Sequence, residues 1–150
     1  MFFTKTKVYK LDVKKSLFVL IKNSLNSKLF RSLYFFVDNK SKDIYQNGKL
    51  SCAFYVSTIL KILGLINDIH ATVNSLIKDM EKSGWSRIKK LQKGAVIVWD
   101  KNKSHHFHVG FYVGKKKAVS NSSSQKMPFL HSINYQKRKI VAIYFHPKLK

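Results

Sequence analysis

Apolar residues recur with a helical period in the N-terminal part of the chain. Between residues 15 and 37 they are spaced by three and four, as on one face of a helix, at Phe18, Ile21, Leu25, Leu29 and Leu33. This pattern predicts a first helix, although residues 35–37 fit a strand equally well. Residues 38–49 are rich in turn formers and predict a loop. Residues 1–14 are basic and predict an irregular arm or an edge strand.

Two further helices are expected before residue 85. The second should begin at Ser51 or Cys52 and end at Gly64, because glycine commonly terminates a helix. The third should have Asn67 or Asp68 as its N-cap and end at residues 83–84. Its buried stripe is predicted at Ile69, Val73, Ile77 and Met80.

The second half of the chain changes to the two-residue period of strands. Residues 95–99 form a continuous apolar run, and residues 107–113 alternate between apolar positions and His108, Gly110 and Tyr112. Further strands are expected at residues 118–121 and 139–145. Helices followed by antiparallel strands predict an α+β fold in which N-terminal helices pack on a small antiparallel sheet.

Length and composition predict one domain, residues 1–150. The chain has 150 residues, of which 45% are hydrophobic, and only six are Gly and two Pro, so no low-complexity linker divides it. The apolar run at residues 17–21 is too short to span a membrane, and no small-residue cleavage site follows it. We expect a monomer without a transmembrane segment, and the localisation stays open.

The net charge of +22 predicts attraction to polyanions such as nucleic acid, anionic lipid or a negatively charged cell wall. Only three of the 29 basic residues are Arg, which leaves 26 Lys. Sequence-specific recognition of nucleic acid relies on the bidentate Arg side chain, which is scarce here. The charge therefore favours an anionic polymer nearby without identifying it.

The single cysteine excludes an internal disulfide and is a candidate nucleophile. Cys52 lies where the second helix should begin, and the positive end of a helix dipole stabilises a thiolate. His108 begins a predicted strand and is the candidate base. The third member, which would orient the imidazole, is expected on the next strand as Asn121 or Ser120.

A metal site is the less favoured interpretation of the histidine cluster at residues 105–108. No carboxylate or second cysteine lies at ligand spacing, and adjacent residues of a strand point in opposite directions. His106 shares a face with His108 and is expected to help shape a substrate cleft. We expect neither a metal nor another cofactor.

Three segments resemble the NlpC-type cell-wall peptidases. They are GKLSCAFYVS at residues 48–57, KGAVIVW at residues 93–99 and HVGFYVG at residues 108–114. The family pattern has Asp-Cys-Ser-Gly-Phe-Val, then Gly-Asp-Leu-Val-Phe-Phe, then His-Val-Gly-Ile-Tyr-Ile-Gly, in the same order. CHAP amidases share this core and are a close second resemblance.

This resemblance implies a papain-like fold that hydrolyses amide bonds in peptidoglycan peptides through a thioester, with Cys52 and His108 as nucleophile and base. Ser51 stands where the family has Asp, and Tyr45 is a possible counterpart of an upstream Tyr, so both are predicted to bind substrate. For the third position, NlpC-type enzymes often have His where this chain has Ser120, whereas CHAP enzymes favour Asn121.

Two other functions stay open. The first is a catalytically inactive basic module that binds nucleic acid or an anionic wall polymer through its Lys-rich surface. The second keeps the cysteine chemistry on another amide substrate, as in a deamidase or a protease for protein tails.

Overall fold

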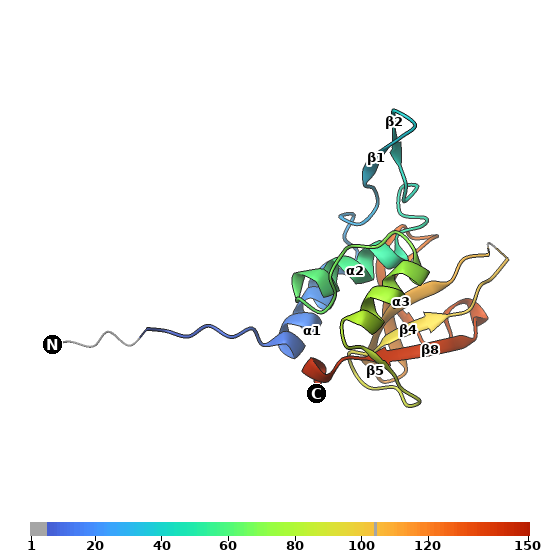
Figure 1. Ribbon diagram of the computed structural model, residues 1–150. Coiled ribbons are helices and arrows are strands. Elements are labelled where there is room, and N and C mark those ends of the chain that lie inside the picture. Colours follow the sequence, from blue (N-terminus) through green and yellow to red (C-terminus); the bar gives the residue numbers. More distant parts are fainter. Residues whose placement is uncertain (1–5, 104) are drawn as a thin grey trace.

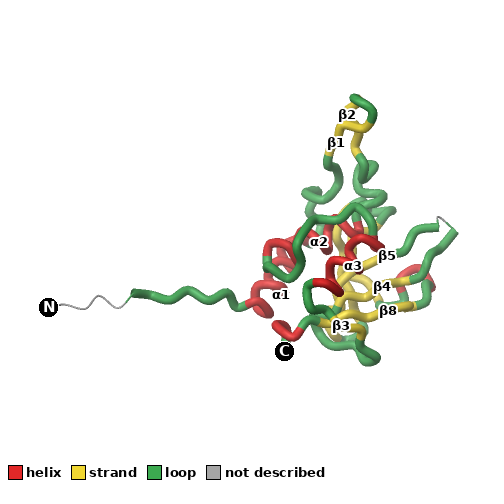
Figure 2. Tube along the Cα trace, viewed as in Figure 1, coloured by secondary structure: helices red, strands yellow, loops and turns green. Residues whose placement is uncertain are grey.

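Three helices pack on an antiparallel sheet in the computed structural model, which describes residues 6–103 and 105–150 (Figures 1 and 2). This confirms the predicted α+β fold. The helices are α1 (Val13–Ser24), α2 (Cys52–Ile62) and α3 (Val73–Lys82), with short 3-10 turns η1 (Tyr135–Lys137) and η2 (Pro147–Leu149). The strands of the main sheet are β3 (Ser86–Arg87), β4 (Val96–Trp99), β5 (His108–Gly114), β6 (Lys117–Ser122), β7 (Met127–Ser132) and β8 (Ile140–Phe145).

The main sheet has the strand order β3-β8-β4-β5-β6-β7, and every pair is antiparallel. Strands β4 to β7 form the expected meander, and β8 returns to pair with the free edge of β4. The register places Val98 opposite both Val109 and Ala142. Because side chains alternate along each strand, this register assigns every second residue to the helical side of the sheet.

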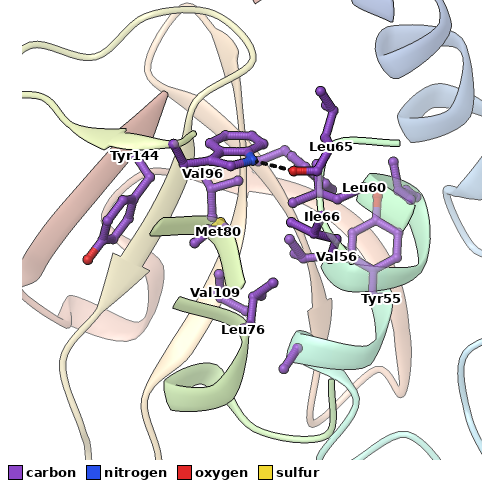
Figure 3. Packing of buried hydrophobic residues seen from close by; sticks show 14 of the residues in the cluster. Tyr55, Val56, Leu60, Leu65, Ile66, Leu76, Met80, Val96, Val109 and Tyr144 are labelled. Atoms are coloured by element: carbon purple, nitrogen blue, oxygen red, sulfur yellow. Dashed lines mark hydrogen bonds between the residues drawn. The ribbon is translucent and has the colours of Figure 1, made fainter. Parts of the chain in front are cut away.

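The sheet therefore has two differently covered faces. On the helical side, Val96 and Val109 belong to the main core together with Leu60 of α2 and with Leu76 and Met80 of α3 (Figure 3). On the opposite face a smaller cluster contains Ile97, Trp99, Ala118 and Tyr135. Within the described residues, no helix has the length and apolar character needed to cross a membrane.

The first helix is shorter than its apolar pattern predicts. It ends at Ser24, and Asn26 adopts a left-handed φ of 62° that breaks the helix. The backbone N–H of Asn26 donates to the carbonyl of Pro128, so a tertiary contact replaces the next helical turn. Leu29, expected on the buried stripe, is 74% exposed. The predicted helix is therefore wrong beyond residue 24.

A separate hairpin follows the helix and projects from the body of the molecule (Figure 1). It consists of β1 (Tyr34–Val37) and β2 (Lys40–Asp43), joined at Asp38 and Asn39, which both have positive φ. A two-residue turn of this kind matches the twist of a hairpin. The strand alternative for residues 35–37 is thus confirmed, whereas the loop predicted for residues 38–49 is wrong over β2.

The third helix begins later than predicted. Thr72 is its N-cap and accepts a hydrogen bond from the backbone N–H of Ser75. The backbone N–H groups of Asn67 and Asp68, the predicted caps, instead donate to the carboxylate of Asp79 inside the helix. Ile69 consequently lies outside the helix and is 46% exposed.

Two further segments, the N-terminal arm and strand β7, can be compared with the prediction. Residues 6–12 are irregular, as the arm interpretation expected, and residues 1–5 lie outside the described part. Strand β7 was not predicted as a strand, because its sequence MPFLHS contains Pro and only a short apolar run. It forms the edge of the sheet beside β6.

Candidate active site

Cys52 is the first residue of α2 and lies at the wall of a cleft. The helix starts there because the carbonyl of Ser51 accepts the first helical hydrogen bond, from the backbone N–H of Tyr55 at 2.9 Å. The next residues of α2, among them Ala53 and Tyr55, are buried in the main core and fix the helix on the sheet. The half-buried thiol points toward the start of β5, with its Sγ 4.0 Å from the carbonyl oxygen of Phe107.

His108 is the first residue of β5 and is 5% exposed. Its ring lies on the face with the smaller cluster, where it stacks on Tyr135 with ring centroids 4.1 Å apart and an interplanar angle of 11°. Both Cys52 and His108 line one cleft of about 820 Å³. Folding therefore brings the predicted nucleophile and base to the same cavity, although 56 positions separate them in the sequence.

Two short hydrogen bonds connect His108 to a second histidine. The Nε2 atom of His108 lies 2.7 Å from the hydroxyl of Ser120, and the same hydroxyl lies 2.7 Å from Nε2 of His131. On its other side, Nδ1 of His131 lies 2.7 Å from the carbonyl oxygen of Ser132. The three side chains come from neighbouring strands β5, β6 and β7 and form a continuous chain.

The direction of these hydrogen bonds follows from the carbonyl at their end. A carbonyl oxygen only accepts, so Nδ1 of His131 donates to Ser132 and Nε2 of a neutral His131 must accept. The Ser120 hydroxyl then donates to His131 and accepts from Nε2–H of His108. This order leaves Nδ1 of His108 without a proton, which is the state that a base requires.

Burial keeps both imidazoles neutral. Burial holds the pKa of His108 well below its usual range, and the positive charge of Arg138 lowers it further, as would that of His131 if its ring were protonated. Burial also lowers the pKa of His131, as does the charge of Lys117, whereas the carbonyl of Ser132 raises it. The neutral His131 assumed in the hydrogen-bond assignment is therefore the favoured form at neutral pH.

The thiol of Cys52 is also held in its neutral form. Burial raises its pKa, and this outweighs the lowering by hydrogen bonds from the backbone N–H groups of Val109 and Ala53 and by the charge of Arg138. The helix terminus was expected to favour a thiolate, but burial has the larger effect here. The two residues that line the cleft are therefore a neutral thiol and a neutral imidazole.

Gly110 allows strands β5 and β6 to approach at the site. It lies on the same face of β5 as His108, and an added Cβ would come within 2.7 Å of Cβ of Ser120 and of the carbonyl oxygen of Val119. Any larger residue would have to push the backbone of β6 away. Gly110 in the HVGFYVG segment thus permits the close approach of β5 and β6 next to the contact between His108 and Ser120.

The other predicted site residues take different positions. Asn121 lines the cleft, but its Nδ2 donates to the carbonyl of Gly48, so Ser120 and not Asn121 holds the His108 ring. Tyr45 is 2% exposed and stacks on Phe54, and Ser51 is 1% exposed. Neither is among the described residues that line the cleft, whereas His106 is.

Two residues of the site were not among its predicted members. The sequence pattern did not place His131 next to Ser120, because β7 was not predicted as a strand that pairs with β6. Arg138 lines the cleft, and its Nη1 donates to the carbonyls of His106 at 2.9 Å and Asp100 at 3.2 Å. Its isolated position in a Lys-rich segment gave no signal of this role.

Comparisons with known proteins agree with this architecture at the level of the fold. No protein-family model and no curated protein sequence matches the chain. Among solved structures, NlpC2 from Trichomonas vaginalis is similar over 95% of this chain, with a TM-score of 0.55 and 16% identity. The crystal structure of Ly7917 is similar over 89% of this chain, with a TM-score of 0.57 and 12% identity. The chain spans 49% and 62% of the lengths of these two proteins. It therefore has an NlpC-like, papain-like fold.

Proposed function

We propose that this chain is a cysteine hydrolase that cleaves amide bonds in peptidoglycan stem peptides through a thioester intermediate. The observation that carries the proposal is the common cleft of Cys52 and His108 on an NlpC-like fold. The chain of hydrogen bonds behind His108 supports it, because an imidazole held in one tautomer is what a general base needs.

The lining of the cleft suits an anionic peptide. Lys49, Lys101 and Arg138 all lie along its wall, and none of the described lining residues is Asp or Glu. Cationic side chains around a cavity raise the local concentration of negatively charged substrates. A peptide with carboxylate groups near the scissile bond would therefore enter this cleft readily.

In the acylation step, Nδ1 of His108 accepts the thiol proton as Sγ of Cys52 attacks the carbonyl carbon of the amide. The negative charge that develops on the carbonyl oxygen lies near the N-terminus of α2, whose first backbone N–H groups have no helical partner. When the carbon–nitrogen bond breaks, the leaving amine takes the proton from His108, and the acyl group remains on sulfur as a thioester.

In the deacylation step, His108 removes a proton from water, and the resulting hydroxide attacks the thioester carbon. The carbon–sulfur bond then breaks, the product leaves as a carboxylic acid, and the proton returns to the sulfur of Cys52. Ser120 and His131 hold the imidazole through both steps. We assign them a positioning role, since neither side chain reaches the reacting atoms.

Kinetics of stem-peptide cleavage by single variants test this proposal. We expect Cys52→Ala to abolish hydrolysis and His108→Ala to lower kcat about 10²- to 10⁴-fold, the usual contribution of a general base. The matched control is His146→Ala, because His146 is also a buried histidine, 7% exposed, but binds the carbonyl of Ser83 away from the cleft.

The control separates a loss of chemistry from a loss of folding. His146→Ala should keep its activity on stem peptides, and circular dichroism should show native secondary structure in all three variants. Hydrolysis by Cys52→Ala at the wild-type rate would overturn the proposal. Tight, salt-sensitive binding of a wall polymer without any cleavage by the wild type would instead favour the inactive binding module.

A further inference from the structure

The β1–β2 hairpin exposes aromatic side chains that the proposed hydrolase chemistry does not use. Tyr34 is 67% exposed, Phe35 45% and Phe36 83%. Within the described part of the chain, β1 and β2 form a sheet of their own and pair with no strand of the main sheet. A contiguous apolar surface of this kind on a small domain marks an interaction site.

The two faces of the hairpin are both apolar along β1. In the antiparallel register, Phe35 lies opposite Lys42 and Val37 opposite Lys40, so these four side chains share one face. Tyr34 and Phe36 lie on the other face. A groove on a partner protein would cover one face and leave the other in water, whereas a surrounding apolar medium would cover both.

The charge of the protein indicates which kind of apolar surrounding the hairpin would enter. Lys40 and Lys42 of β2 are balanced within the hairpin by Asp38 in its turn and by Asp43, whose carboxylate is hydrogen-bonded at its base, so the excess positive charge belongs to the rest of the chain, whose net charge is +22. Aromatic residues are favoured at the interface between lipid headgroups and acyl chains, and each Lys near an anionic leaflet adds attraction. This combination is complementary to an anionic lipid surface.

The base of the hairpin is built rigidly enough to carry such a contact. The carboxylate of Asp43 accepts hydrogen bonds from the Ser32 hydroxyl at 2.7 Å and from the backbone N–H groups of Tyr45 at 3.0 Å and Asn47 at 2.7 Å. The chain then continues into residues 44–50, of which Ile44, Gln46, Lys49 and Leu50 line the cleft. A bound hairpin would thus hold the cleft close to the surface that it contacts.

We infer that the β1–β2 hairpin inserts its aromatic side chains into the interface of an anionic lipid bilayer. This inference does not rest on the proposed hydrolase activity. Phe36 is the central contact because it is the most exposed of the three aromatic residues of the hairpin. The lysines of β2 contact the lipid phosphates, and the remaining Lys-rich surface adds attraction that is not specific to the hairpin.

Co-sedimentation with vesicles tests the inference without changing the charge of the protein. The vesicles contain equal parts of phosphatidylglycerol and phosphatidylcholine. We expect Phe36→Ser to lower the partition coefficient about tenfold, because the variant lacks the aromatic side chain that the lipid interface would bury. Ile62→Ser is the matched control, since Ile62 is 62% exposed at the end of α2, and it should bind like the wild type.

A second variant distinguishes insertion from adsorption by charge alone. Phe36→Trp should show a blue-shifted emission on these vesicles and quenching by lipids brominated in their acyl chains. The inference is overturned if Phe36→Ser binds as tightly as the wild type and Phe36→Trp is not quenched. It is also overturned if Phe36→Ser abolishes a concentration-dependent dimer, or weakens binding to a DNA oligonucleotide as strongly as binding to vesicles.

Discussion

At the scale of single residues, the site combines a neutral thiol with a neutral imidazole. Burial moves the pKa of Cys52 upward and that of His108 downward, so in the proposed mechanism the proton would leave the thiol as it attacks and not before. Which ring nitrogen of the neutral His108 carries the proton then depends on its hydrogen-bond partners. Ser120 and His131 fix Nε2 as the protonated atom, and Nδ1 remains available as a base.

Replacing His131 tests this assignment. His131→Phe keeps a ring in contact with Trp99 and Tyr135 but removes the acceptor for the Ser120 hydroxyl. The orphaned hydroxyl can then donate to His108, which places the proton on Nδ1, and we expect kcat to fall about tenfold to a hundredfold.

The nitrogen chemical shifts of His108 provide a readout that a merely structural role would not change. The wild type should show Nε2–H, and His131→Phe a mixture of both tautomers. A single Nδ1–H tautomer in the wild-type protein would contradict the assignment. Ser120→Ala serves as the companion variant, because it interrupts the same chain of hydrogen bonds one residue closer to His108.

At this scale sequence patterns could point to Cys52 and His108 as candidates, but could name Ser120 only as one of two candidate partners of His108. Cys52 and His108 lie in local motifs, and the structure brings both to one cleft. Their catalytic roles stay predictions. The choice between Ser120 and Asn121 depends on which face of β6 points at His108, and the contact with His131 depends on the pairing of β6 with β7. Such long-range pairings are set by the packed sheet and not by local pattern.

At the scale of elements, the carboxylate of Asp79 joins α3 to the preceding loop. Asp79 is 8% exposed and accepts hydrogen bonds from Asn67, Asp68, His70 and Ser83. Burial raises its pKa, but the hydrogen bonds from His70, Asn67, Asp68 and Ser83 lower it more, so the net shift is strongly downward. The loop of residues 67–72 is therefore ordered by one ionised side chain.

This network predicts a loss of stability in acid. Because the folded-state pKa of Asp79 is depressed, its contribution is complete above the unfolded pKa of about 4 and is lost as the pH falls toward the folded value. We expect Asp79→Asn to lower the free energy of unfolding by about 2–3 kcal/mol at neutral pH and by less at about pH 3.

Urea unfolding at the two pH values measures both effects. Asp38→Asn is the matched control, because Asp38 lies in the exposed turn of the hairpin and should change neither value. A destabilisation by Asp79→Asn that is the same at both pH values would show that the ionised carboxylate is not what orders the loop.

Element boundaries were predictable where local chemistry decides them. Helix α2 and strands β4 and β5 follow from apolar runs and nearby Gly residues, and β8 follows from its apolar run alone. The end of α1 was not predictable in this way, because a backbone contact between Asn26 and Pro128 ends it against its own periodicity. The start of α3 was missed for a similar reason, since Asp79 captures the residues that would otherwise cap the helix.

At the scale of the whole molecule, positive charge, a cleft and an aromatic hairpin occur together on a chain of 150 residues. The segment after β2 forms part of the cleft wall, so the surface that the hairpin contacts and the substrate that enters the cleft would lie close together. The net charge of +22 pointed to a polyanion, but the sequence placed no binding element, because exposure of residues 34–37 is visible only in the folded chain.

The most direct test of the central claim uses the fact that Cys52 is the only cysteine of the chain. The protein is alkylated in steps with iodoacetamide, the modified fraction is read from its intact mass, and stem-peptide hydrolysis is measured at each step. The account predicts that the remaining activity equals the fraction of unmodified protein and reaches zero at complete alkylation. Full activity in completely alkylated protein would contradict it.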